Sequence, residues 1–356
     1  MPCANKLVGL SILICVKEKK MARPRKDFVY LDTTPYYHCV SRCVRKAYLC
    51  GSNQSGRSYE HRRGWIEKKC LKLASLFSID ICAYAVMHNH YHLVLHVNKT
   101  KCDSWSDKEV IERWHQLFKG NHISQQFMKG EILSEAEKAL LSILATTWRN
   151  RLMDISWFMR IVNEGIARQA NREDECTGRF WEGRYKMQAL LDEKALAGCM
   201  AYVDLNPVRA KIAKTPENSE YTSAKKRADY IKNYSDLKNV KSQNKSSSGL
   251  FPFLSGINQE EKTDGLPFHQ EDYLALLDWT GRAISAGKRG VIPADYPPIL
   301  DRLQIDARSW MLMSNHFESR FRRFAGSIEQ IQKVSEQLKQ QWVHGMTAGR
   351  LLSKPA

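Results

Sequence analysis

The stretch "IDICAYAVMHNHYHLVLHV", residues 79–97, predicts two antiparallel strands joined by a tight turn. Residues 79–87 and 90–97 are rich in β-branched and aromatic side chains, and a His-Asn pair separates them. Side chains at alternate positions of a strand leave the same face about 6 to 7 Å apart. His88, His90, His92 and His96 all occupy even positions, so the pattern directs a row of imidazoles to one side of the sheet.

The segments on either side of this hairpin predict an α+β fold. Strands are expected at 35–44 and within 178–191, and helices at 61–77, 106–118, 134–144 and 156–174. A further helix begins near Asp192 and ends before Pro207, because the residue preceding a proline is pushed out of helical geometry. This order of elements favours a ferredoxin-like antiparallel sheet with helices on one face.

Composition divides the chain into four parts. Residues 1–20 are expected to be an over-extended start or a disordered N-terminus, and residues 21–224 to form the main domain, with a helical insertion around 104–150. The basic, serine-containing segment 225–249 predicts a linker. Residues 250–356 predict a helix-rich C-terminal extension that binds DNA or mediates self-association.

Charge and cysteine content narrow the class of protein. The 55 lysines and arginines exceed the 38 acidic residues, and the formal charge of +17 is typical of a nucleic-acid-binding protein. Ten cysteines without a Cys-x-x-Cys pair indicate reduced thiols in a cytosolic protein. The apolar run at 7–16 is too short to cross a membrane. We therefore expect a cytoplasmic protein with no membrane partner.

The His-x-His pair formed by His90 and His92 is a candidate metal site. Imidazole is the commonest metal ligand in proteins, and this spacing aims two rings at one point. No acidic residue lies between Met87 and Lys101, so a third ligand must come from elsewhere. Two imidazoles with an amide would suit a divalent ion that also contacts phosphate oxygens. The alternative is that the histidines are ordinary buried or surface residues.

Tyr202 and Asn206 are a candidate nucleophile and ligand. They lie four residues apart in "AYVDLNPVRA", residues 201–210, so a helix projects both from one face. A tyrosine that attacks a phosphodiester keeps the energy of the broken bond in a phosphotyrosine. Spacing alone favours a plainer interpretation, in which Tyr202 packs in the core and Asn206 caps the turn before Pro207.

Two segments resemble a known family. "HNHYHLVL" (88–95) and "RFWEGRYKMQALLDEKALAGCMAYVDLNPVRAKIA" (179–213) resemble the HUH single-tyrosine transposases of the insertion-sequence-200-like family, especially the REP-associated tyrosine transposases. The first matches the Asn-His-x-His-Leu motif, and the second matches a Trp-x-x-Arg-Tyr segment followed by Tyr-Ile-x-x-Asn-Pro-Val-Arg-Ala. The resemblance covers about residues 28–224. His88 departs from the family pattern, so it receives no ligand role.

The resemblance implies a DNA transposase that acts on single-stranded, hairpin-containing DNA. It assigns His90, His92 and Asn206 to a Mg²⁺ or Mn²⁺ site and Tyr202 to the nucleophile, which forms a 5′-phosphotyrosine before strand transfer. Tyr185 is the reserve nucleophile. The enzyme would be cytoplasmic and nucleoid-associated, either as a homodimer or as a monomer.

Basic and aromatic side chains near these motifs are candidates for binding DNA. Phosphate contacts are expected from Arg160, Arg168, Arg172, Arg179, Arg184, Lys186 and Arg209. Trp181 or Tyr185 would stack on bases. The alternative for each arginine is that it simply lies on an exposed helix face and does not contact DNA. Two other functions stay open: a catalytically inactive DNA-binding regulator, and a metal-dependent nuclease that uses water.

Overall fold

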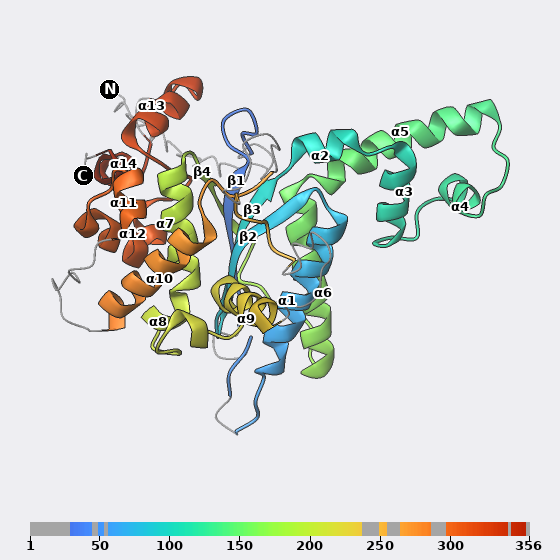
Figure 1. Ribbon diagram of the computed structural model, residues 1–356. Coiled ribbons are helices and arrows are strands. Elements are labelled where there is room, and N and C mark those ends of the chain that lie inside the picture. Colours follow the sequence, from blue (N-terminus) through green and yellow to red (C-terminus); the bar gives the residue numbers. More distant parts are fainter. Residues whose placement is uncertain are drawn as a thin grey trace, which may run out of the picture.

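A five-stranded sheet lies at the centre of the molecule (Figure 1). The computed structural model describes residues 29–44, 49–52, 56–236, 249–254, 264–285, 297–340 and 343–353, so the expected N-terminal segment 1–20 lies outside it. The strands are β1 (Tyr36–Arg42), β2 (Ile79–Val86), β3 (His90–Val97), β4 (Lys186–Leu190) and β5 (Phe324–Ala325), in the order β2-β3-β1-β4-β5. Strands β1 to β4 pair antiparallel, which confirms the α+β class.

Strand β3 alternates between two buried faces. The Tyr91 hydroxyl donates to Asn163 Oδ1 at 2.7 Å, so this side chain faces α6 (Ile155–Glu173). The neighbouring His92 contacts Asn206 on the other side. Helices α1 (His61–Leu76) and α6 form the expected layer on one face, while α7 (Glu193–Asp204) covers the other (Figure 1). Both sheet faces are therefore packed, which explains why β3 is buried along most of its length.

The expected helical insertion forms an arm that projects from the sheet (Figure 1). It contains α2 (Lys99–Ser104), α3 (Asp107–His115), α4 (His122–Met128) and α5 (Glu135–Leu152). A capping box of Ser134 and Glu137 begins α5, as the sequence predicts. Helix α5 continues to Leu152, eight residues beyond the expected end at 144, because Leu141, Ala145 and Trp148 carry a buried face along it.

Residues 223–236 form a helix where a basic linker is expected from 225. Helix α7 ends at Asp204, the short α8 (Asn206–Arg209) follows, and a 3₁₀ turn (Pro216–Asn218) leads to α9 (Ser223–Asp236). The buried Arg227 guanidinium donates to Cys82 O at 2.9 Å and to Phe251 O at 3.2 Å. These hydrogen bonds attach α9 to β2, and composition could not reveal them. Residues 237–248 of the expected linker lie outside the described residues.

The C-terminal extension is helix-rich, as predicted, and it packs on the main domain. Its helices are α10 (Gln270–Ser285), α11 (Pro298–Arg302), α12 (Ala307–Arg320), α13 (Ile328–Gln337) and α14 (Met346–Leu352). Helix α12 lies against α7, where a Cβ on Gly198 would stand 2.6 Å from Met313 Cε. Strand β5 pairs parallel with β4 and extends the sheet. None of the helices in the described residues is long and apolar enough to span a membrane.

Candidate functional site

Three hydrogen-bonded side chains from three elements form the centre of the site. His92 Nδ1 lies 2.9 Å from His38 Nε2 on β1, and His92 Nε2 lies 2.9 Å from Asn206 Nδ2 at the start of α8. The His90 ring stands edge-on to His92, with centroids 4.8 Å apart. His38, His92 and Asn206 are each less than 10% exposed. His92 on β3 and Asn206 at the start of α8 thus meet although they lie more than 100 positions apart in the chain.

One arrangement of protons satisfies this chain of contacts. Gln188 Oε1 accepts only, so at 3.3 Å His38 Nδ1 carries the proton and donates to it. His38 Nε2 then accepts from His92 Nδ1, which leaves the lone pair of His92 Nε2 to face the Asn206 amide. Asn206 Nδ2 donates to this lone pair at 2.9 Å, and a metal ion would take the place of that donor. His38 and Gln188 therefore hold His92 in the tautomer of a ligand.

Burial keeps the imidazoles neutral. It lowers the pKa of His90 to about 4, and it lowers the pKa of His92 well below the ordinary histidine value. Burial likewise lowers the pKa of His38. A neutral imidazole can donate a lone pair to a cation, so all three rings suit ligand or supporting roles at pH 7.

His90, His92 and Asn206 offer two imidazoles and one amide, the donor types of a divalent-cation site, but Asn206 faces His92 with Nδ2, so its Oδ1 would have to turn inward to complete the set. Within the described ranges, no group of three or more His, Cys, Asp or Glu side chains is arranged to hold a metal, so Asn206 is essential to such a site. A mixed nitrogen and oxygen set suits Mn²⁺ better than Mg²⁺, which prefers oxygen ligands.

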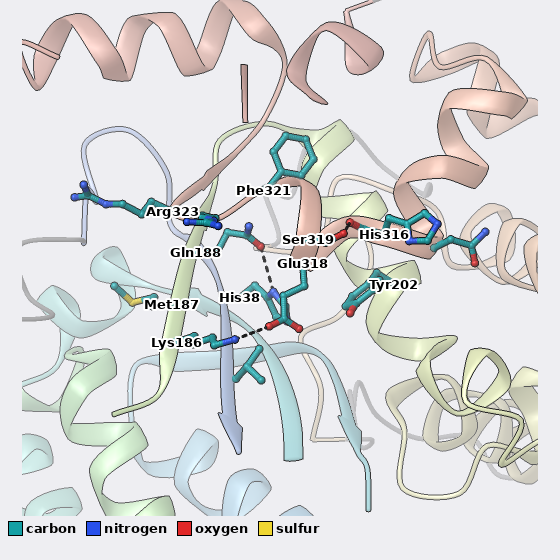
Figure 2. Close-up of a pocket in the computed structure, with 13 residues that line it drawn as sticks. His38, Lys186, Met187, Gln188, Tyr202, His316, Glu318, Ser319, Phe321 and Arg323 are labelled. Atoms are coloured by element: carbon teal, nitrogen blue, oxygen red, sulfur yellow. Dashed lines mark hydrogen bonds and ion pairs between the residues drawn. The ribbon is translucent and has the colours of Figure 1, made fainter. Parts of the chain in front are cut away.

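Tyr202 stands beside this centre on α7. Its ring is edge-on to His92 at 5.8 Å and to His38 at 6.3 Å between centroids. The phenol lines a pocket of about 840 Å³ (Figure 2). Burial raises the pKa of Tyr202, and the nearby charge of Arg209 opposes this shift without cancelling it. The phenol is therefore protonated at neutral pH.

Arg209 is held in the wall of the site. Its Cζ lies 3.9 Å from the Tyr202 ring centroid, and Nη1 donates to Tyr202 O at 2.7 Å and to Ser314 O at 2.9 Å. Burial lowers the pKa of Arg209 to about 10, which leaves the guanidinium charged at pH 7. This position makes Arg209 a neighbour of the phenol, whereas the sequence predicts a phosphate contact for it.

The C-terminal extension supplies the outer wall of the pocket. Figure 2 shows Glu318 of α12 beside His38 and Lys186, and Lys186 Nζ lies 3.1 Å from Glu318 Oε1. The lining also includes His316, Ser319, Phe321, Arg322 and Arg323. The sequence did not assign these residues to the Tyr202 site, and it gave His38 no role. His38 lies on a predicted strand, so its position in the sheet could be expected from the sequence. Its contacts with His92 and Gln188 could not, because they depend on how the strands pair.

The other sequence-predicted residues lie away from this centre, except Lys186. Arg160, Arg168 and Arg172 are exposed on α6, across the sheet from His92, and Arg179 and Arg184 are exposed in the segment before β4. His88 is exposed in the turn between β2 and β3. His96 stacks on Phe251 at 4.4 Å and contacts Asp80 at 3.2 Å, which are structural contacts.

Neither aromatic candidate presents a free ring for base stacking. Trp181 is 8% exposed, and its Nε1 donates to Asn163 O at 2.9 Å. Tyr185 is also 8% exposed, and its hydroxyl lies 3.2 Å from Ser156 Oγ. Both rings pack in the core around α6, so little of either ring is accessible to a DNA base.

Comparisons with known proteins give one distant structural likeness. No protein-family model matches the chain, and no curated protein matches it. A solved structure described as a REP-associated tyrosine transposase bound to a REP hairpin matches 61% of this chain and 92% of its own length. Sequence identity is 11% and the TM-score is 0.31, so this likeness does not assign an activity.

Proposed function

We propose that the chain is a transposase-type enzyme that cuts and rejoins single-stranded DNA through Tyr202. The observation that carries the proposal is the meeting of His92, Asn206 and Tyr202: an imidazole 2.9 Å from an amide, with a tyrosine ring 5.8 Å from the same imidazole. The motifs that resemble the single-tyrosine transposases contain all three residues. The pocket that Tyr202 lines also carries Lys186, Arg322 and Arg323, whose positive charges suit a DNA backbone.

The proposed reaction exchanges one ester bond for another. Tyr202 Oη attacks the phosphorus atom and loses its proton to solvent, while the bond from phosphorus to the 3′ oxygen breaks and that oxygen takes up a proton. The products are a 5′-phosphotyrosine and a 3′-hydroxyl. Attack by a 3′-hydroxyl on the phosphotyrosine reverses the step, rejoins DNA and restores Tyr202. No external energy source is required.

Each residue of the site has a separate task in this proposal. Arg209 lies over the Tyr202 ring and stabilises the phenolate by its charge. His38 and Gln188 orient His92. His90, His92 and Asn206 would hold a divalent cation, which supplies charge neutralisation at the phosphate when it is bound. Lys186 binds the strand from the pocket wall.

A covalent adduct tests the proposal. We expect the full chain, incubated with Mn²⁺ and a labelled single strand that carries a hairpin, to yield a protein–DNA band that survives denaturation. Tyr202→Phe should abolish this band because it removes the attacking oxygen, and Tyr185→Phe should retain it. Burial raises the pKa of Tyr202, so adduct formation should accelerate as the pH rises above 7 and more phenolate forms.

Two outcomes would contradict the proposal. Cutting without an adduct, unaffected by Tyr202→Phe, would indicate a nuclease that uses water. Tight DNA binding without cutting, in the presence of Mn²⁺ or Mg²⁺, would indicate a regulator. His90→Ala separates ligand loss from misfolding, because it should abolish cutting while leaving most DNA affinity, which comes from phosphate contacts.

A further inference from the structure

A second pocket lies in the helical arm, apart from the Tyr202 pocket. It has a volume of about 460 Å³ and is formed by α3, α5, α6 and the segment between α3 and α4. It shares no lining residue with the Tyr202 pocket. Its volume falls in the usual range for small-ligand sites. We name it the arm groove, with Trp114, Phe118, Trp148, Arg151, Trp157 and Arg160 as its defining residues.

Aromatic rings dominate the arm groove. Trp114 stacks on Trp148 at 5.3 Å with an angle of 7° between the rings. Phe118, which is 37% exposed, lies 4.6 Å from Trp114 and 6.1 Å from Trp157 between centroids. Trp157 is half-buried. Four rings from three helices and a loop therefore line one opening, and two of them keep accessible surface.

Guanidinium groups lie among these rings. Arg151 Cζ stands 4.6 Å from the Trp157 ring centroid and 5.5 Å from that of Trp114, and Arg160 Cζ stands 5.2 Å from Trp157. Within the described residues, no carboxylate pairs with Arg151. Lys119 is a third cation of the lining, and the single acid, Glu164, is paired with Arg160 at 2.8 Å. The groove thus favours a negatively charged ligand.

We propose that the arm groove binds unpaired nucleotides of a single DNA strand. Planar aromatic and guanidinium surfaces stack on bases, which are free only where the strand is unpaired, and the surplus cations contact phosphates. A duplex hides its base faces, so it lacks the surface that Phe118 and Trp157 would contact. The groove goes beyond the Tyr202 site and gives Arg160 a place in DNA binding.

Binding of oligonucleotides to the full chain tests this proposal. Fluorescence anisotropy would compare a labelled oligothymidylate with an abasic strand of the same length, which keeps the phosphates and lacks the bases. We expect Phe118→Ala and Trp157→Ala each to weaken oligothymidylate binding about tenfold and to leave abasic-strand binding unchanged. Trp157→Phe, which keeps a ring, should restore most of the affinity.

A matched control and the Tyr202 adduct keep the two proposals separable. Trp65→Ala removes a half-buried tryptophan of α1 that lies outside the groove, and it should not change the affinity. If Tyr202 forms no adduct but the groove variants still lose base-dependent binding, the groove proposal stands alone. Equal loss of affinity for both strands, or unchanged affinity in both variants, would overturn it.

Discussion

At the residue scale, His38 decides how His92 presents its nitrogen atoms. The hydrogen bonds from His38 Nδ1 to Gln188 and from His92 Nδ1 to His38 fix both tautomers. His92 has no other ring nitrogen to offer a cation than Nε2, which faces Asn206. The orientation of a ligand by a partner that does not itself touch the ion is a common feature of metal sites.

Replacing His38 should weaken metal binding without removing a ligand. We expect His38→Ala to reduce Mn²⁺ affinity about ten- to a hundred-fold, because His92 loses the acceptor that fixes its tautomer. Titration calorimetry of the full chain without DNA measures this directly. His38→Gln, whose amide oxygen can accept from Nδ1, should recover part of the affinity. His96→Ala is the control, and an unchanged affinity in His38→Ala would refute the supporting role.

At the element scale, the buried carboxylate of Asp204 joins the end of α7 to α9 and α10 through hydrogen bonds. Asp204 accepts hydrogen bonds from Ala224 N at 2.8 Å and from the Tyr273 hydroxyl at 2.7 Å, and it also accepts from Ser223 Oγ. Burial raises the pKa of Asp204, while Arg227 and these donors oppose the shift. Since Tyr202 and Asn206 flank Asp204, this fastening also positions the site.

Loss of the Tyr273 hydroxyl should destabilise the protein measurably. We expect Tyr273→Phe to lower the free energy of unfolding by about 1–3 kcal/mol, because Asp204 stays buried with one donor fewer. Urea denaturation measures the difference. Tyr221→Phe is the matched control, since Tyr221 is half-buried and its hydroxyl is not part of this network. Equal stability of both variants would show that the hydrogen bond contributes nothing.

At the scale of the whole molecule, the C-terminal helices and the sheet share one core. Phe317 of α12 is fully buried, and its ring lies 6.1 Å from Tyr202 and 6.4 Å from His38 between centroids. Strand β5 continues the sheet beyond β4. Residues from both ends of the described chain thus enclose the Tyr202 pocket. Without the C-terminal helices, the sheet would expose part of its hydrophobic core, and the reverse also holds.

This shared core predicts a single unfolding transition. We expect calorimetry of the full chain to give one peak, and we expect Phe317→Ala to lower the free energy of unfolding by about 3–5 kcal/mol because it leaves a cavity between α12 and α7. Phe118→Ala, which truncates a partly exposed ring of the arm, should change stability far less. Two peaks, with only one displaced by Phe317→Ala, would show that the C-terminal part unfolds independently.

The sequence by itself determined the features that depend on local geometry. The period of two along a strand placed His90 and His92 on one face. The helix expected to carry both Tyr202 and Asn206 ends at Asp204 instead, and Asn206 begins α8. The position of Arg209 over the Tyr202 ring was not predicted, because Arg209 is also held by Ser314 O on α12, which lies more than 100 residues further along the chain. Local sequence patterns do not specify which distant residues will pack against a given face.

Only the tertiary structure decided which distant residues share a site. His38 reaches His92 because β1 pairs with β3, and Gln188 reaches His38 because β4 pairs with β1. Glu318 reaches the pocket because α12 packs on α7, and the rings of the arm groove meet because three helices cross. These contacts join positions far apart in the chain, and the free energy that selects them comes from burying whole faces together.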